Sequence, residues 1–211
     1  MENLTESETR TLAAILKTNA HSYGLDDHFQ DNASIWLEYD GAFVYCYRGS
    51  YGQKGMVVAK YKASSGAPGY QRARYESTKD YGPLPEGKYW VLLMPNPARV
   101  AKHDSRTGEL LANPEGGIEK IPGSVVVGGH TLIYPGWGNT RARLFADRGT
   151  QTFGRSNFYL HDSHKGYSHG CIETSPHIFD LLMKARQSFT KVALMVDYAN
   201  VDTSTYGESD K

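Results

Sequence analysis

Three histidines and a cysteine lie within eleven residues of one another in the segment FYLHDSHKGYSHGCIE, residues 158–173. They are His161, His164, His169 and Cys171. Cysteine is a nucleophile only as its thiolate, and a nearby histidine or helix N-terminus lowers the pKa of the thiol. Cys171 has both features in sequence, because Ser175, four residues later, is a good helix cap. The segment is therefore a candidate site for covalent catalysis by cysteine.

The residue before the cysteine supports this interpretation. Gly170 allows a tight turn and lets a substrate carbonyl approach the backbone. The N–H groups of Gly170 and Cys171 then become candidates for an oxyanion hole.

Two other interpretations stay open. The same four side chains are good zinc ligands, although the paired spacing of CxxC or HExxH is absent. A lone cysteine is also commonly a small buried hydrophobe, which suits Cys46 in its apolar run better than Cys171 after Ser-His-Gly.

The surrounding sequence predicts strands with one helix. Residues 34–49 form two runs rich in aromatic and β-branched residues around Asp40-Gly41, which indicates a hairpin. Further strand-like runs continue to SNFYLHD, just before the cluster. A helix is expected after the cluster, with Ser175 as N-cap and Pro176 at its first position. We therefore predict a mostly β fold (β-rich α+β), largely antiparallel, with a helix following the cysteine loop.

The chain is expected to divide into three parts. Residues 1–33 read as a short amphipathic helix and a polar linker, residues 34–199 as the main domain, and residues 200–211 as a loose, flexible tail. The 22 glycines and nine prolines of the 211 residues imply many turns, which suits a β-rich domain.

Charge and hydropathy exclude some classes of function. Lys plus Arg equals Asp plus Glu at 23 each, so nothing in the net charge favours a nucleic-acid partner. No apolar run of about 18 residues exists, so no membrane span is expected. The N-terminal segment lacks the pattern of an ordinary signal peptide.

The segment 158–174 resembles the signature of the L,D-transpeptidases with a YkuD-like catalytic domain, in which an upstream histidine is followed by Ser/Thr-His-Gly-Cys. The match is Ser168-His169-Gly170-Cys171. The run KDYGPLPEGKYWV is similar to another segment of that superfamily, and the resemblance spans about residues 36–198. The sequence departs from the family at Asp162, in the short loop to the cysteine, and at Glu173.

The resemblance implies a YkuD-like β-sandwich and a reaction. The Cys171 thiolate would attack the carbonyl of meso-diaminopimelate in a peptidoglycan tetrapeptide stem, expel D-Ala and leave a thioester. Water would then give L,D-carboxypeptidase activity, and an amine would give D-amino-acid exchange or cross-linking (L,D-transpeptidase activity). No cofactor or metal is expected.

The same resemblance implies roles for the neighbours of the cysteine. His161 is the expected base, His169 orients the loop or assists the thiolate, and Ser168 and Gly170 shape the turn and the oxyanion site. Arg155 is a candidate for binding a substrate carboxylate, with an ordinary surface arginine as the alternative. Asp162 is a weaker candidate for orienting an imidazole, and His164 is expected to be exposed.

Within the superfamily, the compact loop and small size look most like the type VI secretion L,D-transpeptidase effectors, which are antibacterial toxins. This implies delivery to the periplasm of target bacteria without a classical signal peptide, type VI secretion components as partners and a cognate immunity protein. The alternatives are a housekeeping L,D-transpeptidase and a non-catalytic or zinc-stabilised cell-wall-binding domain. A papain-like hydrolase fits less well, because its cysteine precedes its histidine.

Overall fold

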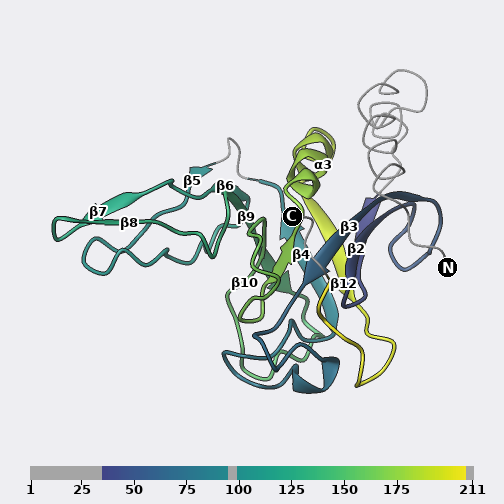
Figure 1. The fold of residues 1–211 in the computed structure, drawn as a ribbon. Coiled ribbons are helices and arrows are strands. Elements are labelled where there is room, and N and C mark those ends of the chain that lie inside the picture. The colour runs from purple at the N-terminus through teal and green to yellow at the C-terminus, as the bar shows by residue number, and fades with distance from the viewer. Residues whose placement is uncertain (1–34, 95–98, 208–211) are drawn as a thin grey trace.

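A computed structural model describes residues 35–94 and 99–207 of the chain. Their backbone forms a ten-stranded sheet with the order β10-β11-β3-β2-β1-β12-β4-β9-β6-β5, and a separate hairpin of β7 and β8 (Figure 1). The strands are β1 Ile35–Tyr39, β2 Phe43–Arg48, β3 Val57–Ser64, β4 Gly87–Leu92, β5 Arg99–Val100, β6 Ile118–Lys120, β7 Val125–Val127, β8 His130–Leu132, β9 Thr140–Ala146, β10 Phe158–His161, β11 Ile172–Thr174 and β12 Lys191–Val196. The helical elements are the 3-10 turn η1 Ala73–Tyr75 and the α-helix α3 His177–Ala185.

The sheet closes on itself. Strand β10 pairs with β11 on one side and with β9 on the other, so the strands from β10 through β12 and β4 to β9 form a ring. Most neighbours are antiparallel, but β10–β11, β1–β12 and β5–β6 are parallel. The prediction of a mostly β fold with a helix after the cysteine loop is confirmed. Opposite sides of the ring face each other across the core, and both sides belong to this one continuous sheet.

The predicted hairpin forms around Asp40-Gly41. Strands β1 and β2 pair with Tyr39 opposite Val44. The Asp40 carboxylate accepts hydrogen bonds from the backbone N–H groups of Ala42 and Phe43, at 2.9 and 2.8 Å. Gly41 has a φ of +106°, a conformation that glycine adopts without steric cost. Local sequence therefore determines this turn.

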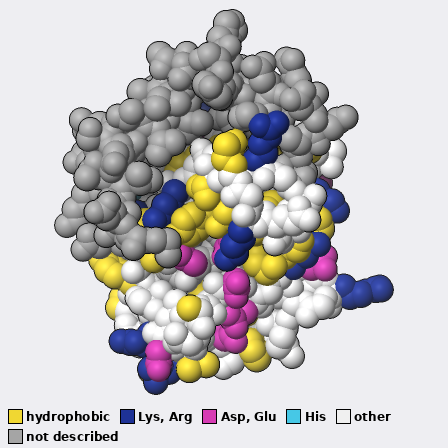
Figure 2. All heavy atoms as spheres, turned by 90° about the vertical axis from the view of Figure 1, so that its right-hand side faces the viewer, with side chains coloured by type: hydrophobic (Ala, Val, Ile, Leu, Met, Phe, Trp, Pro, Cys, Tyr) yellow, Lys and Arg dark blue, Asp and Glu magenta, His cyan; other side chains and the backbone are white. Residues whose placement is uncertain are grey.

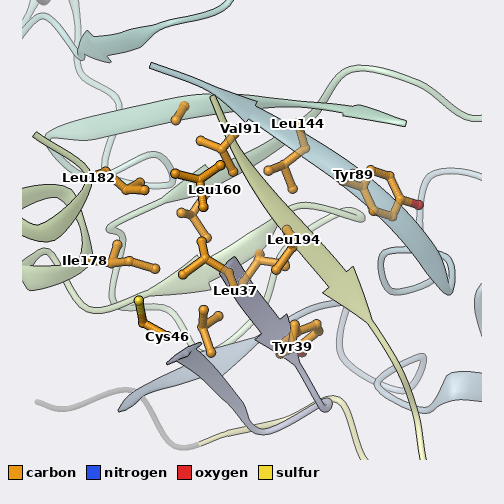
Figure 3. Packing of buried hydrophobic residues seen from close by; sticks show 14 of the residues in the cluster. Leu37, Tyr39, Cys46, Tyr89, Val91, Leu144, Leu160, Ile178, Leu182 and Leu194 are labelled. Carbon is orange, nitrogen blue, oxygen red and sulfur yellow. The ribbon is translucent and has the colours of Figure 1, made fainter. Parts of the chain in front are cut away.

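The core fills the space inside the ring. Leu37, Leu160 and Leu194 come from three different strands and are fully buried (Figure 3). Ile178 and Leu182 of α3 complete the cluster, and burying a side chain of this size contributes about 1.5–3 kcal/mol.

Cys46 also lies in this cluster, as expected of a buried strand residue. Burial raises the pKa of its thiol to about 12, so it remains a neutral thiol.

The start of α3 differs slightly from the prediction. Pro176 occupies the cap position, one residue before the helix, and the Ser175 hydroxyl accepts only a long 3.4 Å hydrogen bond from the N–H of His177. At nine residues, α3 is too short to cross a membrane, and no other helix in the described ranges is long and apolar enough.

The expected flexible tail is wrong as far as residue 207. The hydroxyl of Thr205 donates to the carbonyl of Ser65 at 2.8 Å, and its own carbonyl accepts from the Ser65 N–H at 2.8 Å. Thr205 is fully buried, so residues 200–207 pack on the domain rather than leaving it. The expected helix and linker of residues 1–33 and the last residues, 208–211, lie outside the described residues.

Charges of both signs lie close together on the surface. On the face shown in Figure 2, described Lys and Arg side chains lie among Asp and Glu side chains and hydrophobic ones. Among the described residues of this face, charges of the two signs are mixed rather than gathered into a patch of one sign.

Candidate active site

The parallel pairing of β10 and β11 brings the two ends of the histidine–cysteine cluster together. Leu160 lies opposite Ile172, and both side chains point into the core. Because side chains alternate along a strand, the residues that flank this pair point to the outer face of the sheet. They are Tyr159, His161 and Glu173, and Cys171 directly precedes β11.

Cys171 comes just before β11, at a position diagonal to His161 in the strand register. The backbone N–H of Tyr159 acts to lower the pKa of its thiol, while Glu173 lies directly opposite His161. Diagonal neighbours on adjacent strands are roughly 7 Å apart at the backbone, which a histidine side chain can span. The structure thus brings the backbone positions of the expected nucleophile and the expected base close together.

The imidazole of His161 is held by a hydroxyl and a carboxylate. Its Nδ1 lies 3.1 Å from the Oγ of Ser163, and that hydroxyl donates to Glu173. Because the Ser163 proton points to Glu173, its oxygen accepts a hydrogen bond from Nδ1–H of His161. This leaves Nε2 without a proton, which is the tautomer that a general base requires.

Glu173 is in turn fixed by the loop that precedes the cysteine. Its two carboxylate oxygens accept hydrogen bonds from the backbone N–H groups of Lys165, at 3.1 Å, and Gly166, at 2.5 Å. A buried carboxylate requires such donors, and Glu173 is 1% exposed. The carboxylate, Ser163 and His161 therefore form a connected relay.

His161 is neutral in the resting site. The ring is 2% exposed and packs against the ring of Trp137, with centroids 5.4 Å apart. Burial, followed by the positive charges of Lys165 and Arg141, lowers the pKa of His161 to about 3. The imidazole therefore carries only one proton at any pH near neutrality.

Cys171 rests as a thiol. The residue is partly exposed to solvent, yet the protein packed around its sulfur raises the pKa of the thiol to about 11. The Tyr159 N–H and the positive charges of Arg141, Arg155 and Lys165 oppose this rise without cancelling it. A nucleophilic role for this thiol would therefore require a base to remove its proton, because it does not rest as a thiolate.

The turn that carries the cysteine is tied down on both sides. The carbonyl oxygen of Cys171 accepts hydrogen bonds from the hydroxyls of Ser168 and, at 2.8 Å, Ser65. The N–H of Ser168 donates to the carbonyl of Gly66 at 3.1 Å. Ser168 therefore contacts the backbone at both ends of this turn.

Gly170 is required by this geometry. Its φ is +103°, and a Cβ at this position would lie 2.2 Å from Nη2 of Arg155. Within the described part of the chain, neither the N–H of Gly170 nor that of Cys171 donates a hydrogen bond to the protein. Both groups are thus available as the donors of an oxyanion hole.

Arg155 contacts the protein rather than open solvent. Its guanidinium donates to the backbone carbonyls of Glu76, Pro83 and Gly82, the last two at 2.6 and 2.7 Å. The residue is 8% exposed and stacks on Phe158. These contacts favour a structural role, in which Arg155 fastens the 76–83 segment beside the cysteine turn, over the expected binding of a substrate carboxylate.

The remaining polar residues of the cluster make no contact with the His161 imidazole that the structure records. His169 is exposed, and its Nδ1 hydrogen bonds to the carbonyl of Asp80 at 2.7 Å, which connects its loop to the 76–83 segment. His164 is exposed. Asp162 accepts from the N–H groups of Asn139 and Thr140, at 2.5 and 2.8 Å, so it holds that turn and does not orient His161.

The histidines and the cysteine do not converge as metal ligands. Residues 35–94 and 99–207 contain no group of three or more His, Cys, Asp or Glu side chains placed to hold a metal ion.

Sequence reasoning missed three members of this site. Ser163 and Glu173 complete the relay, and Trp137 covers the base. Glu173 is visible in the sequence as a departure from the family pattern, but its function depends on the pairing of β10 with β11. Trp137 lies 24 positions before His161, and no local pattern links the two.

Comparisons with known proteins give weak likenesses. No family model matches the chain, and no curated protein matches it. Among solved structures, an L,D-transpeptidase from Mycobacterium smegmatis is 19% identical with a TM-score of 0.38, covering 78% of this chain and 59% of that one. Bd1075 of Bdellovibrio bacteriovorus is 11% identical with a TM-score of 0.38, covering 78% and 47%. This chain therefore spans about half to three fifths of the length of these two structures.

Proposed function

We propose that this protein is a cysteine-dependent acyl-transfer enzyme that acts on the peptide stems of peptidoglycan. One observation carries the proposal: Cys171 lies two residues before Glu173, the strand partner of His161, and His161 is held by Ser163 and Glu173 in the tautomer of a base. An accidental cluster of histidines has no need of such a relay.

In the first half-reaction, Nε2 of His161 takes the thiol proton as Sγ of Cys171 attacks a peptide carbonyl carbon. The N–H groups of Gly170 and Cys171 receive the negative charge on the carbonyl oxygen. The tetrahedral intermediate then collapses, the C–N bond breaks and the departing amine takes the proton from the imidazolium. A thioester on Cys171 remains.

The second half-reaction releases the acyl group. Water or the amine of a D-amino acid loses a proton to His161 and attacks the thioester carbonyl, and the C–S bond breaks to restore the thiol. Water yields a shortened stem, and an amine yields an exchanged or cross-linked one. The Ser163–Glu173 relay stabilises the imidazolium in both halves through the hydrogen bond at Nδ1.

The choice of substrate rests on the Ser168-His169-Gly170-Cys171 string and its resemblance to the L,D-transpeptidases. On that basis the donor is a tetrapeptide stem, the bond broken follows meso-diaminopimelate, and the leaving group is D-Ala. We further propose that the protein acts in the periplasm of rival bacteria as a type VI secretion effector, with an immunity protein in its producer.

Intact-protein mass spectrometry with a tetrapeptide donor tests the chemistry. The wild-type protein should gain the mass of the stem without D-Ala, and the adduct should map to Cys171. The Cys171→Ala variant should gain nothing, whereas a Cys46→Ala variant should still be acylated. An adduct that persists in Cys171→Ala would rule out this nucleophile.

A further inference from the structure

Five aromatic rings form a continuous row beside the cysteine turn. Tyr75 contacts Tyr70 with ring centroids 5.3 Å apart, and Tyr70 contacts Tyr81 at 5.2 Å. The row continues from Tyr81 to His169 at 6.2 Å and from His169 to Tyr167 at 6.4 Å. We call these five residues the aromatic row. One of its members, His169, is two residues before Cys171 in the chain.

The aromatic row faces solvent with unused polar groups. Tyr81 is 50% exposed and Tyr70 36% exposed. Within the described residues, none of the row's four tyrosine hydroxyls hydrogen bonds to the protein. Other tyrosines of this fold direct their hydroxyls to backbone carbonyls, as Tyr39, Tyr89 and Tyr198 do. The row therefore offers both flat apolar faces and free donors and acceptors.

The aromatic row is held rigidly. Its residues come from two segments, 66–82 and 164–170, that are tied together by the hydrogen bond from His169 to the Asp80 carbonyl and by one from Gln71 Nε2 to the Gly166 carbonyl, both 2.7 Å. Gly82 packs so closely that a Cβ there would lie 1.9 Å from the Tyr75 carbonyl oxygen. A surface ordered before binding loses little conformational entropy when a ligand arrives.

We propose that the aromatic row binds the sugar rings of the glycan strand to which the stem peptides are attached. A pyranose presents a face of C–H groups that stacks on an aromatic ring, and its hydroxyls at the rim match the free phenol hydroxyls. Two of its members, Tyr167 and His169, belong to the loop that runs into Cys171. This inference rests on the proposed function, because a stem on Cys171 brings its own sugar beside the row.

Binding of a sugar chain without peptide tests the inference. The probe is an N-acetylglucosamine oligosaccharide, titrated into the full-length protein by isothermal calorimetry. Tyr81→Ala and Tyr70→Ala should each weaken binding by about tenfold, since loss of one stacking contact is commonly of that size. Tyr51→Ala removes a tyrosine from the β2–β3 connection, at the end of β3 away from the row, and should leave binding unchanged.

The same variants separate this inference from the proposed function. Tyr81→Ala should still be acylated by a soluble sugar-free tetrapeptide, and Cys171→Ala should still bind the oligosaccharide. Failure of acylation in the wild type would remove the proposed function while the row remained a sugar site. No oligosaccharide binding, or equal binding by wild type, Tyr81→Ala and Tyr70→Ala, would overturn the inference even if acylation succeeds.

Discussion

The hydroxyl of Ser163 lies 3.1 Å from Nδ1 of His161 and donates its proton to the carboxylate of Glu173. A serine two positions after the base thus connects it to an acid ten positions further along the chain. The arrangement gives His161 a defined tautomer and gives the imidazolium formed during attack a partner for its positive charge.

Replacing Ser163 with alanine should slow acylation without unfolding the protein. Glu173 keeps its hydrogen bonds to the backbone of Lys165 and Gly166, so its carboxylate stays satisfied. The imidazole loses its orientation, and we expect the single-turnover rate of thioester formation to fall about 10- to 100-fold. Ser175→Ala, which removes only the long hydrogen bond at the start of α3, is the control. An unchanged rate in Ser163→Ala would show that the relay plays no part in catalysis.

The pKa values of the site predict slow labelling of the cysteine. Since burial raises the pKa of Cys171 to about 11 from an ordinary 9.0, the thiol should react with iodoacetamide more slowly than free cysteine at pH 7. Labelling should accelerate as the pH rises toward 11. Peptide mapping distinguishes Cys171 from Cys46, whose thiol is fully buried. Rapid labelling at pH 6 to 7 would instead indicate a preformed thiolate.

The pKa of His161 predicts how stability depends on pH. The folded value of about 3 lies below the ordinary 6.5, so the unfolded chain binds the proton more readily. The contribution of this group is therefore complete above pH 6.5 and is lost as the pH falls from 6.5 toward 3. The free energy of unfolding, measured by urea titration from pH 7 to pH 4, should fall more steeply in the wild type than in His161→Gln. Parallel curves would contradict the buried, neutral imidazole.

A methyl group at Gly170 should disrupt the cysteine turn. Gly170→Ala places a Cβ against the guanidinium of Arg155 as well as straining a positive φ, and we expect a loss of more than about 1 kcal/mol together with loss of acylation. Gly129→Ala is the matched control, because Gly129 also has a positive φ, +80°, but nothing lies within 4 Å of its Cβ position. Thermal unfolding and acylation should separate the two variants. If both variants lose the same stability and activity, the close approach of Arg155 to Gly170 does not contribute to either.

Local sequence predicted the features that depend on local contacts. The turn at Asp40 and Gly41 is stabilised by hydrogen bonds to the next two residues in the chain. The helix at residues 177–185 has an apolar face, which can pack against any apolar sheet surface. Cys46 lies in an apolar strand and is buried as such a residue should be.

Other features depend on which strands meet, and these were not predicted. Arg155 carries a charge that suggests exposure, but three carbonyls from residues 76–83 accept its hydrogen bonds in the fold. Thr205 looks like part of a polar tail, yet it adds a backbone pairing to Ser65, 140 positions earlier. The relay of Glu173 to His161 likewise exists only because β10 and β11 are neighbours. A single sequence contains no local pattern for such pairings.

The proposed effector role predicts toxicity in one compartment only, the one in which the proposed substrate is found. Tetrapeptide stems occur in the assembled wall, whereas cytoplasmic precursors carry pentapeptides, which are poor donors for an enzyme of this kind. Expression in the bacterial cytoplasm should therefore be tolerated, and expression with an added periplasmic signal should reduce viable counts by orders of magnitude. Cys171→Ala and His161→Ala should both abolish the effect, while Tyr51→Ala, which lies outside the site, should keep it. Removal or exchange of the fourth residue would deprive the host's own cross-linking of donors, so the surviving cells should show altered stems in mass spectra of their wall fragments. Equal toxicity in both compartments, or toxicity that survives Cys171→Ala, would exclude the effector role.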